Sequence, residues 1–334
     1  MKMSVGEFKK RLLEAVLGLL WRQWTQLGVA GHNTAVEHYV LDPEALLIFT
    51  AYFGRYDQRL FDEVMDWLGT NQRFMNVQRL RTLSRNASFP HQAVLGYIAA
   101  VLKAGDASLK WRKLAEDWKP EKYHTPNGLF ILSSGMIMPV VGCTDKTALQ
   151  YGFKRNPLRA TGNSQNFPST TIATLLLQLR GFFGINARSE VMLGLLSEDH
   201  CTIQEIAELS GFSWRSIQDV LFEMKHSNVV EATAAKKGRY YFLKNKEAVL
   251  KLFWTNTSAV CFPDWLALYN MIAMIFSALC LPPLPQVSDL AFESVMREVL
   301  TTQIEGLLLN ARFTEIKHVS WEKLEEFPLL VEQL

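Results

Sequence analysis

Residues 202–230 read TIQEIAELSGFSWRSIQDVLFEMKHSNVV, and this stretch decides the fold. Its apolar residues recur at helical spacing on both sides of Gly211, a glycine near its middle. Thr202 and Ser213 are residue types that cap helix N-termini, so a helix is expected to begin after each of them. Glycine adopts a positive φ at little steric cost, which a tight turn between helices requires. The stretch therefore predicts two helices joined at Gly211.

The apolar residues on either side of the turn predict how the two helices pack. In the second helix, Ile217 is followed by Val220, Leu221 and Met224, so these four side chains share one face. Ala207, before the turn, offers a small side chain where the helices would cross, and Ile217 is expected to fill the same crossing. A small residue, a glycine and a branched apolar residue at these positions are typical of a helix-turn-helix.

The residues around this pair of helices extend the pattern. Upstream, residues 189–197 (SEVMLGLLS) predict a preceding helix, and downstream the strand-forming residues 229–233 and 239–243 flank a basic turn at Lys236 and Lys237. Residues 188–253 thus resemble the winged-helix domains of bacterial transcription regulators, including the MarR-like and ArsR-like groups. The resemblance covers only this part of the 334-residue chain, and it implies binding to duplex DNA without indicating an operator sequence.

Charge is distributed unevenly over the predicted domain. Residues 189–210 contain five acidic residues and no Lys or Arg, whereas residues 211–246 contain seven Lys or Arg against three acidic residues. Cations that approach DNA phosphates release condensed counterions, so the basic half favours a contact with duplex DNA. Taken alone, the Lys236–Lys237 turn is equally compatible with a solvated loop.

The resemblance and the helical spacing together give a set of candidate DNA-binding residues. The exposed face of the second helix is expected to present Ser213, Trp214, Arg215, Ser216, Gln218 and Asp219. Arg215 is a candidate for a bidentate contact with guanine and Gln218 for one with adenine, whereas Trp214 is expected either to pack on backbone sugars or to cover the domain. The resemblance places Lys236, Lys237 and Arg239 on phosphates or in an adjacent minor groove. Arg188 is a further candidate for a backbone contact.

The rest of the chain predicts a mainly α fold, in which a winged helix-turn-helix domain is flanked by N-terminal and C-terminal helical domains. The expected division is an N-terminal helical domain (residues 1–118), a hairpin and linker (119–168), a connecting helix with the winged helix (169–253) and a C-terminal helical domain (254–334). Within the first, Asp42 and Pro43 predict a helix start, and a later helix carries Arg79, Arg81 and Arg85 as weaker candidates for DNA contact. A hairpin is expected at residues 129–141, and the leucine-rich residues 172–183 predict burial, either between domains or in a subunit interface.

Composition and motifs exclude several classes of function. Net charge is +2, which does not by itself indicate a nucleic-acid binder. No phosphate-binding loop, dinucleotide fingerprint, zinc-protease motif or nucleophile elbow occurs, so we expect no catalytic residues, no cofactor and no metal site. Four cysteines without a CxxC pair favour a reducing cytoplasm. The apolar residues 265–281 are short for a membrane span, and a buried helix is expected there, with no membrane contact.

Three functions remain open on this sequence. The first is a sequence-specific, homodimeric transcription regulator or repressor. The second is a winged-helix adaptor that binds proteins. The third is a DNA-binding protein, such as an antitoxin-like autorepressor, whose binding a small-molecule or protein effector controls. Residues 265–281, beside Trp254 and Phe262, could line an effector pocket, although core packing is the commoner use of such a helix.

Overall fold

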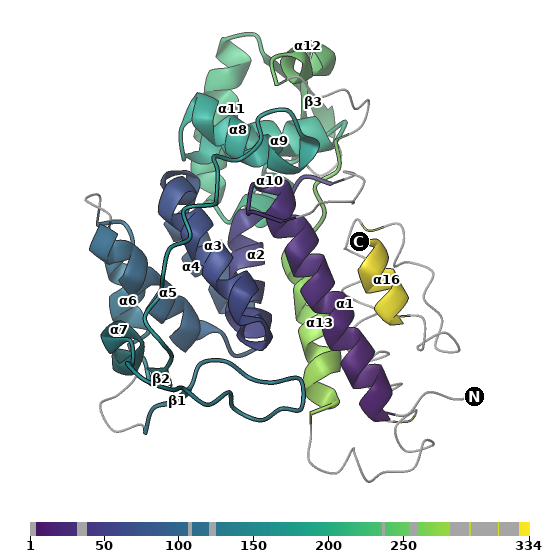
Figure 1. Cartoon of the computed structure of the whole chain (residues 1–334). Coiled ribbons are helices and arrows are strands. Elements are labelled where there is room, and N and C mark those ends of the chain that lie inside the picture. The colour runs from purple at the N-terminus through teal and green to yellow at the C-terminus, as the bar shows by residue number, and fades with distance from the viewer. Residues whose placement is uncertain are drawn as a thin grey trace.

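The computed structural model describes residues 5–31, 39–105, 109–119, 125–235, 238–253, 260–280, 294, 313 and 327–334. Helices dominate the fold, as the sequence predicts, and the described strands form two two-stranded sheets. Figure 1 shows a lobe that carries α8 to α12 above a body in which α2 to α7 lie on one side and α1, α13 and α16 on the other.

The body is built on helices whose starts are visible in the sequence. Its N-terminal elements are α1 (Val5–Gln26), α2 (Pro43–Phe53), η1 (Gly54–Tyr56), α3 (Gln58–Asn71), η2 (Gln72–Phe74), α4 (Val77–Asn86), α5 (Gln92–Gly105) and α6 (Arg112–Asp117). Asp42 caps α2, because its Oδ1 accepts hydrogen bonds from the backbone N–H groups of Glu44 and Ala45 at 3.1 and 3.0 Å. The predicted start at Asp42 and Pro43 is therefore confirmed, and α2 is buried along almost its whole length.

The described C-terminal helices share their core with the N-terminal ones. These helices are α13 (Trp265–Ala278) and α16 (Phe327–Gln333). The ring of Tyr269 in α13 stacks on Phe49 of α2 with centroids 4.2 Å apart, and its hydroxyl donates to Gln23 of α1 over 2.8 Å. Residues 265–278 thus form the expected buried helix and do not pack in a core of their own. None of the helices in the described ranges combines the length and the apolar character that a bilayer crossing needs.

Residues 125–168, which precede the lobe in the sequence, differ in part from the expected hairpin. The structure has β1 (Asn127–Gly128) in parallel with β2 (Phe153–Lys154), and α7 (Lys146–Gln150) between them. Residues 129–141 do turn back, but their antiparallel pairing is the isolated bridge between Ile131 and Ile137. Across the turn, the N–H of Leu132 donates to Met136 over 2.8 Å and that of Met138 to Phe130 over 2.9 Å. Arg55 takes up other backbone groups of the segment: it accepts from the N–H of Ile131 and donates from Nε to the carbonyl of Leu129, each over 2.8 Å. The expected reversal of the chain is therefore confirmed, but its antiparallel pairing is limited to one bridge and does not form two strands.

The lobe contains residues 202–230, the stretch from which the fold was predicted. Its elements are η3 (Ile172–Thr174), α8 (Leu175–Phe183), α9 (Ala187–Ser197), α10 (Ile203–Ser210), α11 (Trp214–His226), β3 (Val230–Ala235), β4 (Gly238–Leu243) and α12 (Lys246–Lys251). The apolar side chains of η3 and of the first part of α8 are buried within one chain, including Leu175, Leu176, Leu177 and Leu179, whereas Phe182 near the end of α8 is 66% exposed. Of the two expected uses of this leucine surface, burial inside the chain is the one observed.

Candidate nucleic-acid interface

The turn between α10 and α11 has the geometry that the glycine predicts. Gly211 has φ 70° and ψ 12°, the left-handed region, and its N–H donates to the carbonyl of Ala207 over 2.9 Å. Thr202 and Glu205 form a capping box at the start of α10. Ser213 caps α11, since its hydroxyl accepts from the N–H of Ser216 over 3.2 Å. Both predicted caps and the turn are confirmed.

The helices around the turn pack through the predicted apolar face and one unexpected glycine. Ile217, Val220, Leu221 and Met224 of α11 are all buried. The close approach of helices lies at Gly194 of α9, where an added Cβ would stand 3.3 Å from Ile206. Ala207, expected at the crossing, is only half-buried.

The strands that follow α11 close the side of these helices. β3 and β4 pair antiparallel from Val230 opposite Leu243 to Ala235 opposite Gly238. Cys201, just before α10, exchanges backbone hydrogen bonds with Tyr241 of β4 at 3.0 and 2.8 Å. The segment between α9 and α10 thereby extends the sheet at one residue and ties the hairpin to the helices.

The candidate residues on α11 divide into structural and exposed ones. Ser213 and Ser216 join their hydroxyls over 2.8 Å at the start of the helix, where they fix the cap. The remaining four point outward and are exposed: Trp214, Arg215, Gln218 and Asp219. Trp214 is 49% exposed, so it does not cover the core.

Three candidates from separate elements meet in one groove. Trp214 and Gln218 of α11 and Arg239 of β4 line one groove of about 320 Å3, together with Thr202 and Gln204 at the start of α10. An extended ligand along this groove would touch α10, α11 and β4 together. The structure therefore brings the exposed helix face and one basic residue of the hairpin into a common surface.

The other basic candidates lie differently. Arg188 of α9 forms an exposed ion pair with Glu223 of α11, so its charge is matched within the chain. Exposed pairs of this kind contribute little, so the phosphate contact of Arg188 stays a prediction. Lys236 and Lys237 lie outside the described residues, between the paired residues Ala235 and Gly238.

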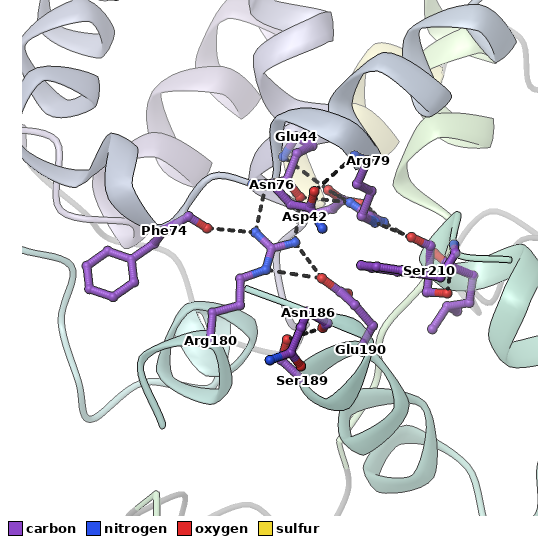
Figure 2. Close-up of polar contacts among 12 residues, drawn as sticks. Asp42, Glu44, Phe74, Asn76, Arg79, Arg180, Asn186, Ser189, Glu190 and Ser210 are labelled. Atoms are coloured by element: carbon purple, nitrogen blue, oxygen red, sulfur yellow. Dashed lines mark hydrogen bonds and ion pairs between the residues drawn. The ribbon is translucent and has the colours of Figure 1, made fainter. Parts of the chain in front are cut away.

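A buried charge cluster lies behind this surface, where the lobe meets the body (Figure 2). Arg79 of α4 holds both carboxylate oxygens of Asp42, from Nη1 over 2.7 Å and from Nη2 over 2.6 Å. Its Nη1 also donates to Glu44 over 2.9 Å. From Nε it donates to the carbonyl of Ser210 over 3.0 Å, and from Nη2 to that of Leu209 over 3.3 Å. Arg79 thus joins the start of α2 to the last residues of α10.

A second arginine continues the cluster into α8 and α9. Arg180 holds both carboxylate oxygens of Glu44, over 2.7 and 2.8 Å, and donates from Nη2 to Glu190 of α9 over 2.7 Å. Its Nη1 also reaches the carbonyl of Phe74 over 3.0 Å. Asn76 donates its backbone N–H to Glu44 over 2.8 Å. Glu44 is therefore the carboxylate that both guanidiniums share.

The cluster is inside the protein and carries one more negative than positive charge. Its five ionisable side chains are each at most 6% exposed: Asp42, Glu44, Arg79, Arg180 and Glu190. Burial by itself would raise the pKa of Asp42, but the charge and hydrogen bonds of Arg79 outweigh it and hold that pKa below its ordinary value. Removing one partner of such an arrangement leaves a buried charge uncompensated.

Two of the three arginines on the basic helix of the body are engaged within the chain, and a DNA contact by this helix stays a prediction. Arg79 is buried in the cluster, and Arg81 forms an ion pair with Asp117 over 2.6 Å. Arg85 alone of the three is exposed. The place of Arg180 and Glu190 in the cluster was missed, because nothing near Arg180 in the sequence marks its partner Glu44, which lies 136 residues away. The one indication in the sequence was that Arg180 lies in an otherwise apolar helix that is expected to be buried.

Comparison of the chain with protein-family models, with curated proteins and with solved structures gave no match.

Proposed function

We propose that residues 188–253 form a winged helix-turn-helix domain that binds duplex DNA, and that the protein acts as a bacterial transcription regulator in the cytoplasm. One observation carries the proposal: the left-handed turn at Gly211 leads into a capped helix whose outward face is polar, next to Arg239 of a two-stranded hairpin. A helix of this kind fits the major groove, and a hairpin beside it reaches the backbone.

The proposed contacts divide into those that read bases and those that bind phosphate. Arg215 and Gln218, both exposed on α11, have the donors for bidentate contacts with guanine and adenine. Arg239 lines the same groove as Gln218, where it would meet the sugar-phosphate backbone. Lys236 and Lys237 are proposed for the same role on the basis of their sequence position.

The cluster behind the interface supports a fixed orientation of α11. Gly211 packs on α4, since an added Cβ would lie 3.6 Å from Thr82 and 3.7 Å from Arg79. With Arg79 bonded to the carbonyls of Leu209 and Ser210, the turn is held on the body by packing and by charge-assisted hydrogen bonds. A base-reading helix gains affinity when its position is set before binding.

The test is a titration of a fluorescent random duplex with the full chain at several salt concentrations, followed by fluorescence anisotropy. The proposal predicts binding whose logarithm falls linearly with the logarithm of the salt concentration. An arginine on another surface supplies a matched control: Arg112→Ala on α6, which removes an exposed pair with Glu116, should leave the curve unchanged. Absence of any salt-dependent binding would rule the function out.

Homodimerisation and repression are part of the proposal and rest on the symmetry of operators rather than on an apolar interface. Two copies would each read one half-site, as two-fold related regulators do. The leucines of α8 that suggested an interface are buried within one chain. Sedimentation of the protein with and without duplex DNA tests the dimer, and a monomer under both conditions would refute it.

A protein-binding adaptor is the second candidate, and exposed apolar side chains favour it. Phe222 is 61% exposed on α11, one helical turn after Gln218, and Trp214 is 49% exposed on the same helix. Aromatic residues are enriched in the centres of protein interfaces. If Phe222→Ala leaves DNA binding intact, the aromatic residue is not part of the duplex contact and this second use gains support.

A further inference from the structure

A cavity of about 570 Å3 lies between α10 of the lobe and the helices of the body. Its volume is within the range of small-molecule sites, roughly 300–1,000 Å3. Side chains from α4, α10, α13 and the segment before α13 form its walls, among them Leu83, Leu209, Phe262 and Trp265. Trp265 donates its indole N–H to the carbonyl of Val40 over 2.8 Å, so its polar atom is satisfied inside the protein. Phe262 and Trp265 are almost fully buried, so the apolar part of the cavity consists of their edges together with the half-buried Leu209.

The charged side chains that line the cavity and have no ion-pair partner among the described residues are all negative. Arg79 reaches it, but its guanidinium is already bonded to Asp42 and Glu44. Three further carboxylates line the cavity and are exposed: Glu205, Glu208 and Asp264. Within the described part of the chain, none of these three forms an ion pair. Each of the three accepts hydrogen bonds from uncharged donors of the chain, namely from Thr202, Gln204 and the N–H of Ala267. Carboxylates without a cation beside apolar residues suit a ligand with a positive group and an apolar part.

Because of the position of the cavity, a bound molecule would contact both the lobe and the body where the two meet. Glu205, Glu208 and Leu209 belong to α10, which leads into the turn at Gly211, whereas Leu83 and Trp265 belong to α4 and α13 of the body. A molecule held between them would touch the element that precedes α11 and the surface on which it rests. Its affinity would therefore depend on how the lobe sits on the body.

We propose that this cavity binds a small organic cation, an amine or guanidine compound with an apolar ring or chain, and that binding alters the affinity for DNA. The positive group lies against Glu208 and Asp264, and the apolar part against Leu209 and Phe262. The regulatory half of this inference rests on the proposed DNA-binding function, whereas the binding half does not. By thermodynamic reciprocity, the cation and the duplex change each other's affinity by the same factor.

Isothermal titration calorimetry of the full chain, without DNA, tests the binding half. The probes are tryptamine and indole-3-acetate, which share an indole ring and carry opposite charges. We expect one tryptamine per chain and binding of indole-3-acetate that is at least roughly tenfold weaker. Equal affinity for the two probes, or no heat from tryptamine up to about 10 mM, would overturn the inference.

Two substitutions locate the site. Glu208→Gln removes one carboxylate and keeps an oxygen for the hydrogen bond that Gln204 donates over 2.6 Å. Asp264→Asn removes another and keeps an N-cap for α13, since asparagine caps as well as aspartate. Each is expected to weaken tryptamine roughly tenfold. Glu247→Gln on α12, an exposed carboxylate away from the cavity, is the control and should not change the affinity. Unchanged affinity in both cavity variants contradicts the site.

The regulatory half has a separate readout. The duplex titration is repeated with and without saturating tryptamine, for the wild type and for Glu208→Gln. A shift in duplex affinity that the variant loses supports coupling through the cavity. An identical shift in both proteins, or no shift, refutes the coupling. Failure of all DNA binding would instead refute the proposed function and leave the calorimetric result standing.

Discussion

The guanidinium of Arg79 donates from Nε to the carbonyl oxygen of Ser210 over 3.0 Å, across 131 residues of sequence. Ser210 is the last residue of α10, immediately before the turn at Gly211. The carbonyls at a helix C-terminus lack partners inside the helix and carry partial negative charge, so a guanidinium there is favourable. Because Arg79 is held in turn by Asp42 and Glu44, one side chain ties the turn to the start of α2.

Arg79→Met is expected to lower the free energy of unfolding by about 3–5 kcal/mol, because it leaves Asp42 and Glu44 with one fewer cation in a buried site. Urea denaturation followed by circular dichroism measures the change. Arg81→Ala on the same helix is the matched control, since it removes a partly exposed pair with Asp117 and should cost less than about 1 kcal/mol. Equal losses of unfolding free energy in the two variants would show that the buried cluster stabilises the fold no more than the partly exposed pair does.

Gly211→Ala is expected to destabilise the protein by about 1–2 kcal/mol, because alanine is strained in the left-handed region. The cost is one of backbone conformation, since the added Cβ would meet Thr82 and Arg79 only at ordinary contact distances, 3.6 and 3.7 Å. Gly69→Ala in α3 is a control of opposite sign. Its Cβ meets nothing within 4 Å, and replacing a helical glycine should stabilise by about 0.5–1 kcal/mol. Thermal unfolding of both variants checks the two signs.

The cluster also predicts how stability depends on acid. Asp42 has a pKa below its ordinary value in the folded protein, so the unfolded chain binds its proton more readily. The stability that Asp42 contributes is therefore present above the ordinary carboxyl pKa and is lost as the pH falls through the lowered one. Asp42→Asn should flatten the acid side of a plot of unfolding free energy against pH. An unaltered slope in that variant would contradict the assigned ion pair with Arg79.

Local signals in the sequence were enough to place the elements of the lobe. Thr202, Gly211 and Ser213 act through hydrogen bonds and backbone angles within a few residues, so their roles can be predicted without the fold. The apolar spacing of α11 then predicted its buried face correctly. Two strands after α11 were also predicted, and β3 and β4 lie within one or two residues of the expected bounds.

Interactions between distant residues could not be predicted in this way. Arg79 looked like a solvent-facing basic residue because its partners Asp42 and Glu44 lie 37 and 35 residues away. Residues 129–141 turn back as their composition predicts, but Arg55 forms hydrogen bonds with the backbone of Leu129 and Ile131, and the antiparallel pairing stays at one bridge. In both cases an interaction with a remote segment decided the outcome.

Phosphate-binding and base-reading residues of the proposed interface should respond differently to substitution. Replacing Lys236 and Lys237 with alanine should weaken binding to all duplexes alike and reduce the slope against salt by about one for each phosphate that is no longer neutralised. Arg215→Ala should instead cost about 1–3 kcal/mol on a duplex selected from a random pool and much less on random DNA. Circular dichroism of each variant checks that the fold is kept, and Arg215 is exposed on α11.

The most direct test of DNA reading by α11 is the ratio of affinities for the selected and the random duplex, measured by anisotropy for wild type and Arg215→Ala at one salt concentration. A base-reading α11 predicts that the ratio falls by roughly tenfold or more in the variant, while affinity for random DNA changes little. If wild type binds the two duplexes equally, or if Arg215→Ala leaves the ratio unchanged, α11 does not read bases through Arg215.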